Sequence, residues 1–267
     1  MKIPSGNWKQ AGFSMLEMLV VVAILTTVMA VVFGQIMQVQ KRSRAEDQKL
    51  DLTQESREFV DQIVRDVHSI GYPTQRMYGS TTITTSPIVN DHTVALGLVK
   101  IAYDELWFEG DVDGDGSVDV IDYKLQADAN GNCPCKLSRS QNPKVDGDPF
   151  SGQNTANYNM ELNNVINSGG AGGGTSGTAK YALTGTSGGT SDNTVYASYK
   201  TANVFTFYDE TGTEIPPSDY SNLAGQANLA KVRAIRININ VLAAQADLQT
   251  TMQPVMSYSV AVRTPNQ

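Results

Sequence analysis

The sequence predicts an α+β protein in which one long N-terminal helix, membrane-spanning in its first half, packs on an antiparallel β-sheet domain. Residues 13–37 are mostly apolar and carry one formal charge, Glu17, and a helix of this length exceeds the roughly 30 Å hydrocarbon core of a membrane. Residues 38–70 contain no proline, and their apolar side chains recur at helical spacing. After Gly71 and Pro73 the pattern changes to short alternating runs separated by turn residues, which is typical of strands.

These changes of pattern divide the 267 residues into four segments. Residues 1–12 form a short basic segment, 13–37 the membrane helix, 38–70 its amphipathic continuation, and 71–267 a β-rich globular domain. The continuation carries an apolar stripe that predicts one buried face, made of Leu52, Phe59, Val60, Ile63, Val64, Val67 and Ile70. Residues at about 167–193 are mostly Gly, Ser and Thr, so we expect a flexible loop there.

The N-terminal residues contain a possible processing signal in addition to the apolar helix. Lys2 and Lys9 precede the Gly12-Phe13 junction, and Glu17 is the fifth residue counted from Phe13. These positions resemble the signal of the type IV prepilin family. The resemblance implies that a prepilin peptidase cleaves between Gly12 and Phe13 and that the new amine of Phe13 is N-methylated. A plain transmembrane anchor is the alternative, whereas an ordinary secretory signal has a shorter apolar region of roughly 7–15 residues.

Glu17 is the one carboxylate within the apolar run. A charged side chain in a membrane helix costs up to about 2.5–3.5 kcal/mol on insertion scales, so such residues usually have a partner. In the pilin family this carboxylate faces the N-terminal amine of a neighbouring subunit. The resemblance therefore implies that Glu17 sets subunit register during assembly, while in the isolated subunit it can lie at the level of the lipid headgroups.

Further stretches resemble one branch of that family. Residues 55–73 are similar to the helix end of PilW-like minor pilins and of the J-type minor pseudopilins of type II secretion, and Leu137-Ser138-Arg139 matches a Leu-x-Arg sequence of PilW-like proteins. The resemblance implies a pilin-like fold and three partners: prepilin peptidase, other minor and major pilins, and the inner-membrane assembly platform. It implies a minor pilin that helps initiate assembly in a tip complex. The alternatives are a J-type pseudopilin and a tip adhesin with a calcium-held loop.

Charge bears on location and partners. Lys2 and Lys9 favour a cytoplasmic N-terminus, although Lys41, Arg42 and Arg44 after the apolar run oppose that orientation. With the resemblance, we expect a single-pass inner-membrane protein that then enters a pilus fibre at the cell surface. The formal net charge of −7 argues against nucleic acid as a partner.

Residues 111–122 have two interpretations. The Asp-Gly pairs at 113–116 predict a β-hairpin turn. The same stretch also fits a calcium loop, with Gly116 at position 6. Its oxygen donors at positions 1, 3, 5, 7, 9 and 12 are Asp111, Asp113, Asp115, the backbone carbonyl of Ser117, Asp119 and Asp122. This spacing resembles dockerin-type loops, but the flanks read as strands and not as EF-hand helices. Ca²⁺ is thus the one cofactor that the sequence suggests.

Cys133 and Cys135 flank Pro134 and are the only cysteines. In an exported domain they can form a local or an intermolecular disulfide, which we favour over a metal role. A redox pair normally has two residues between its cysteines. The sequence shows no nucleophile–histidine arrangement and no phosphate-binding loop, and its two histidines, His68 and His92, lie in different kinds of segment. We therefore expect no enzymatic activity.

Overall fold

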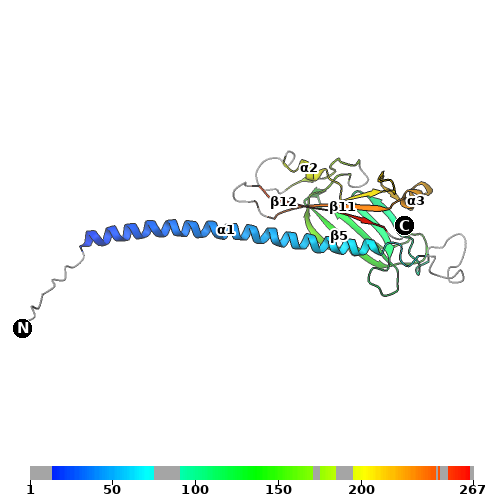
Figure 1. Ribbon diagram of the computed structural model, residues 1–267, viewed down its shortest axis with the longest axis horizontal. Helices are drawn as coiled ribbons and strands as arrows, with labels where there is room; N and C mark the ends of the chain where they lie inside the picture. Colours follow the sequence, from blue (N-terminus) through cyan, green and yellow to red (C-terminus); the bar gives the residue numbers. More distant parts are fainter. Residues whose placement is uncertain are drawn as a thin grey trace, which may run out of the picture. The chain divides into compact units, whose positions relative to one another are not determined.

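The computed structural model describes residues 14–74, 91–170, 175–184, 195–244, 246 and 252–264. It divides into two compact units, Met1–Asp47 and Gln48–Gln267. Helix α1, Met15–His68, supplies the described part of the first unit and the opening element of the second (Figure 1). The prediction of a long N-terminal helix followed by an antiparallel sheet is confirmed.

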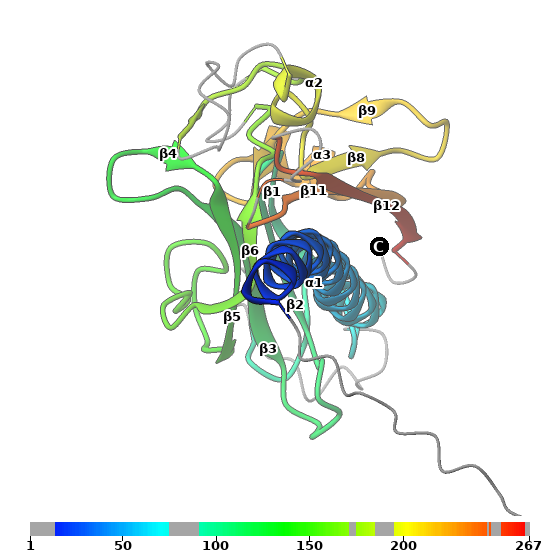
Figure 2. The same ribbon diagram turned by 90° about the vertical axis from the view of Figure 1, so that its left-hand side faces the viewer.

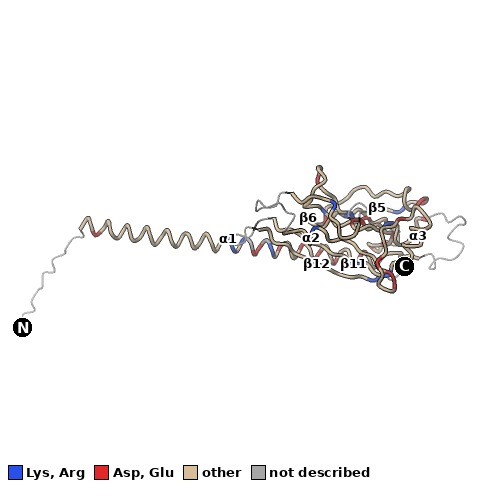
Figure 3. The backbone as a smooth tube through the Cα atoms, turned by 90° about the horizontal axis from the view of Figure 1, so that it is seen from above, with Lys and Arg blue, Asp and Glu red and all other residues tan. Residues whose placement is uncertain are grey.

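The first unit presents an apolar helical surface. Its large apolar side chains from Met15 to Val39 are 44% to 89% exposed. The most apolar window has a mean hydropathy of 2.6 and none of it is buried, so by length and composition this helix could cross a membrane. Figure 3 shows the charged residues gathering on the later part of α1 and leaving most of its earlier part bare.

In the second unit, α1 buries the predicted stripe. Phe59, Ile63, Val67 and Ile70 are at most 4% exposed, and Leu52, Val60 and Val64 pack beside them. The helix ends at His68. Gly71 follows with φ of +70°, a left-handed conformation that favours glycine, and its N–H donates to the carbonyl of Glu109 at 2.9 Å. The stop signal in the sequence therefore marks the point where the chain turns onto the sheet.

The main sheet has ten strands, and all of its pairings are antiparallel. In spatial order it runs β10 (Ser218–Asp219), β1 (Leu98–Ala102), β2 (Glu105–Gly110), β3 (Asp119–Gln126), β5 (Cys135–Pro143), β6 (Asn159–Val165), β11 (Ala234–Leu242), β8 (Phe205–Tyr208) and β9 (Glu214–Ile215), and β12 (Val255–Arg263) also pairs with β11. A second, parallel pair joins β4 (Asn132–Cys133) to β7 (Ala182–Leu183). The short helices are α2 (Ala197–Lys200) and α3 (Leu223–Leu229).

The core lies between the C-terminal part of α1 and the sheet. Figure 2 shows β3, β5, β6, β11 and β12 arranged around this part of the helix. Its largest fully buried side chains include Tyr123, Phe108, Phe205 and Phe207. Strand β2 is buried at all six positions, because its other face is covered as well: Trp107 stacks on Phe150 with ring centroids 5.3 Å apart. The middle of the sheet is therefore covered on both faces. The turn between β2 and β3 extends from this buried part of the sheet.

The flexible loop predicted at about 167–193 is described only in part, and its first residues make specific contacts. Asn167 is fully buried; its Nδ2 donates to the carbonyl of Asn238 at 3.0 Å and its Oδ1 accepts from the N–H of Asn240 at 2.6 Å. A Cβ atom at Gly169 would lie 2.0 Å from the carbonyl oxygen of Thr201, so glycine there permits close backbone packing. Residues 182–183 form β7. Residues 171–174 and 185–193 lie outside the described parts of the chain.

Candidate functional site

The predicted processing residues Gly12 and Phe13 lie outside the described residues, whereas Glu17 is in the first turn of α1. Its N–H donates to the carbonyl of Ser14 at 3.0 Å, and the helix begins at the next residue, Met15. A carboxylate in a first turn interacts favourably with the positive end of the helix dipole. Glu17 therefore lies, exposed, at the beginning of an apolar surface that extends for six further turns.

The acidic stretch folds as a tight connection between β2 and β3. The two strands are in register up to the pair Gly110 and Asp119. Between them, Asp111 caps the turn: its Oδ1 accepts from the N–H of Gly114 at 2.7 Å and its Oδ2 from the N–H of Gly116 at 3.1 Å. Gly114 and Gly116 have φ of +76° and +90°, which explains why glycine follows the aspartates. The hairpin interpretation is confirmed.

Three of the predicted calcium ligands come together. Asp111, Asp113 and Asp115 each place a carboxylate oxygen within 4.8 Å of the others. Asp119 lies beside them, since Gln141 Nε2 is 2.7 Å from Asp119 Oδ2 and 3.5 Å from Asp113 Oδ2. Burial, with the neighbouring carboxylates adding to it, raises the pKa of Asp119 to about 6. Such crowding of like charges is what a bound cation would relieve.

Of the two remaining predicted ligands, Ser117 lies in the loop and Asp122 lies outside it. The N–H of Ser117 donates to Asp115 Oδ1 at 2.7 Å. Asp122 is the twelfth residue of the expected loop, but it lies within β3, three residues beyond Asp119 and hence on the opposite face of the strand. Its Oδ2 accepts a hydrogen bond from Tyr158 Oη. The closing ligand predicted by the calcium-loop spacing is therefore corrected, because the chain enters the sheet before position 12.

A buried polar cluster joins α1 to the sheet, and the sequence analysis missed it. Asp66 Oδ2 accepts from Tyr123 Oη at 2.7 Å and from Arg139 Nε at 2.7 Å. The side chains of Asp66 and Arg139 are 3% and 13% exposed. Burial, with the Asp66 charge beside it, raises the pKa of Tyr123 well above its ordinary value, so the phenol stays protonated and donates. A signal was present, because Asp66 falls three residues after Ile63 on the apolar face of the helix.

Cys133 and Cys135 are joined to each other in a disulfide, with Cα atoms 4.2 Å apart. Both are buried, and no free cysteine remains. Of the two predicted arrangements, the structure has the local one. The bridge joins the last residue of β4 to the first residue of β5.

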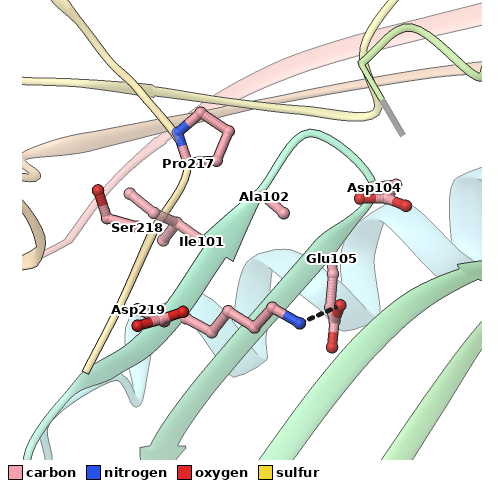
Figure 4. Close-up of a pocket in the computed structure, with 8 residues that line it drawn as sticks. Ile101, Ala102, Asp104, Glu105, Pro217, Ser218 and Asp219 are labelled. Carbon is pink, nitrogen blue, oxygen red and sulfur yellow. Dashed lines mark hydrogen bonds and ion pairs between the residues drawn. The ribbon is translucent and has the colours of Figure 1, made fainter. Parts of the chain in front are cut away.

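A cavity of about 270 Å³ lies where β10 meets β1 (Figure 4). Its lining includes Lys100, Glu105, Asp104 and Asp219. Lys100 Nζ is 2.6 Å from Glu105 Oε2, and Lys124 Nζ is 3.4 Å from the other oxygen of the same carboxylate. Both lysines therefore pair with Glu105, and Asp104 and Asp219 add two further carboxylates to the lining.

The chain is thus an α+β protein whose long N-terminal helix could cross a membrane by length and composition. The family model for the prokaryotic N-terminal methylation motif matches residues 9–33. No curated protein and no solved structure matches the chain. The match supports a type IV prepilin-like protein, and the proteins that carry this motif are structural rather than enzymatic. It covers the Gly12-Phe13 junction and Glu17.

Proposed function

We propose that the protein is a minor type IV pilin that helps initiate pilus assembly, as part of a priming complex at the filament tip. The observation that carries the proposal is the methylation motif at residues 9–33, whose part from Met15 onward lies on a helix with exposed apolar side chains. This arrangement suits a subunit that is stored in a membrane and later packs its helix against the helices of other pilins.

Burial of the apolar helix surface favours both the membrane-inserted state and the assembled filament. Removing one Val, Leu, Ile or Met side chain from water contributes about 1.5–3 kcal/mol. The helix exposes a continuous series of such side chains between Met15 and Val39, so in water it would aggregate. A lipid bilayer covers this surface before assembly, and neighbouring helices cover it afterwards. Glu17, the one charge in the series, then needs a cationic partner, which the N-terminal amine of an adjacent subunit can provide.

Processing and location follow from the same proposal. Prepilin peptidase cleaves after Gly12, and the amine of Phe13 is methylated. Before assembly the chain spans the inner membrane once, with a cytoplasmic N-terminus, and its second unit lies outside the membrane. The assembly platform then transfers it, with other minor and major pilins, into the fibre.

Substitution at Glu17 tests the register role. We expect Glu17→Ala to leave peptidase cleavage largely intact and to reduce incorporation into sheared filaments, because the paired charge is lost. Glu46→Ala is the matched control: this exposed carboxylate lies on the same helix beyond the apolar run. Normal incorporation of the Glu17→Ala protein would contradict the proposed pairing.

Two alternatives differ in their partners. A J-type minor pseudopilin would prime a type II secretion pseudopilus, so the chain would co-purify with pseudopilins and its loss would reduce secretion. A tip adhesin would be required for attachment while filament number stays normal. The tip-adhesin alternative includes a loop held by calcium. The β2–β3 hairpin supports that part, because Asp111, Asp113 and Asp115 bring together the oxygen ligands that Ca²⁺ prefers.

The calcium part of that alternative has its own test. A ligand that binds only the folded state at 100 times its Kd stabilises that state by about 2.7 kcal/mol. We expect millimolar Ca²⁺ to raise the melting temperature of the full chain in detergent relative to a chelator, and Asp113→Ala to abolish the rise. Asp148→Ala, at another exposed turn, is the control. An unchanged melting temperature would leave a metal-free acidic turn.

A further inference from the structure

We propose that Asp91, His92 and Asp146 form a binding site for a divalent transition-metal ion of the Zn²⁺ type, separate from the acidic hairpin. Each of the three residues offers a ligand atom, and these atoms all lie within 4.8 Å of one another. His92 Nδ1 is 2.9 Å from Asp146 Oδ1 and 3.9 Å from Asp91 Oδ1. Asp146 is 54 residues from His92, so the fold brings these groups together.

The ligand chemistry selects the class of ion. One imidazole nitrogen with two carboxylates is a donor set that Zn²⁺ and related ions accept, whereas Ca²⁺ prefers oxygen ligands alone. With a neutral imidazole, the two carboxylates carry two negative charges, which match a divalent cation. The side chains of His92 and Asp146 are 60% and 59% exposed. An ion can therefore reach the site and keep water at its remaining positions.

A buried ion pair holds both parts of the site in place. Lys144 Nζ is 2.7 Å from Glu109 Oε2, and both side chains are fully buried. Lys144 also donates to the carbonyl of Val94, and the same Glu109 oxygen accepts from the N–H of Leu96 at 2.9 Å. Lys144 lies two residues before Asp146, and Val94 lies two residues after His92. One ion pair therefore anchors both segments that carry the ligands.

Hydrogen bonds already orient the carboxylates. The N–H of His92 donates to Asp146 Oδ1 at 2.7 Å. Asp91 Oδ1 accepts from the N–H and the Oγ1 of Thr93, at 2.8 and 2.6 Å. These bonds hold both carboxylates beside the ring of His92, whose Nδ1 lies at hydrogen-bond distance, 2.9 Å, from Asp146 Oδ1. Ligands fixed in this way lose little freedom on metal binding.

The test is titration of the full chain in detergent, free of any histidine tag, with Zn²⁺ by calorimetry and with Co²⁺ by visible absorption. We expect one ion per chain, a higher melting temperature with Zn²⁺, and at least about a tenfold loss of affinity in His92→Ala. His68→Ala is the matched control, because His68 is the only other histidine and is also exposed. It should bind the ion as the unaltered protein does.

Two further variants distinguish metal binding at this site from binding at the acidic hairpin and from a loss of folding. Asp146→Asn keeps an acceptor for the N–H of His92 but removes a charged ligand, so it should weaken Zn²⁺ binding without unfolding the segment. Asp113→Ala should leave Zn²⁺ binding unchanged, because it alters only the hairpin. Absence of Zn²⁺ binding by the unaltered chain, or equal binding by the His92→Ala protein, would overturn the proposal.

Discussion

The Asp66 cluster gives a quantitative prediction about what fixes α1 to the sheet. Asp66→Ala would leave Arg139 with 13% exposure and without its carboxylate partner. Removing one member of a buried ion pair destabilises a protein by about 3–5 kcal/mol, because the remaining charge stays buried and unpaired. In a domain of this size, each 1 kcal/mol lowers the melting temperature by about 2–4 °C. We therefore expect the second unit to melt about 6–20 °C lower.

The assay is thermal or urea unfolding of the full chain in detergent, followed by the fluorescence of buried Trp107. Asp61→Ala is the matched control, since this exposed carboxylate lies on the same stretch of helix; its effect should stay within about 0.5 kcal/mol. Replacing the whole cluster by apolar groups, as Asp66→Leu, Tyr123→Phe and Arg139→Met together, should recover most of the lost stability. A loss below about 1 kcal/mol for Asp66→Ala would refute the reasoning.

Two further predictions concern the sheet. Burial raises the pKa of Asp122 from 3.8 to about 7, so the folded protein loses stability as pH rises through this window and the carboxyl group ionises. An asparagine does not ionise. The Asp122→Asn protein should therefore become more stable than the unaltered chain, by up to about 4 kcal/mol, as pH rises from 4 to 8. A pH-independent difference in melting temperature between the two proteins would contradict this. Gly110→Ala should destabilise the protein by about 1–3 kcal/mol and so lower the urea concentration at the unfolding midpoint. The reason is that the new Cβ would lie 2.2 Å from the carbonyl oxygen of Ser69, just after the end of α1. An unchanged midpoint would show that the helix end can move.

Local patterns in the sequence predicted the parts of the fold that depend on neighbouring residues. The apolar stripe containing Phe59 and Ile63 identified the buried face of α1, because helical spacing alone decides which side chains share a face. The aspartate–glycine sequence identified the β2–β3 hairpin, since Gly114 and Gly116 adopt conformations that favour glycine.

Contacts between distant residues could not be predicted in this way. Asp66 meets Arg139 across 73 residues, and the Asn167 side chain meets the backbone of Asn240 across a similar separation. The Gly-, Ser- and Thr-rich composition at about 167–193 predicts flexibility, but it does not reveal the close packing of Gly169 against the backbone of Thr201. The calcium-loop spacing likewise counted Asp122 as a ligand, because sequence spacing does not show where a strand begins.

The most direct test of the pilin assignment is the mass and N-terminal sequence of the chain recovered from host membranes. We predict a chain that begins at Phe13, lacks residues 1–12, and carries one methyl group on its N-terminal amine. An intact N-terminus at Met1, or cleavage beyond the apolar run, would contradict the assignment and leave an ordinary anchor or a secretory signal.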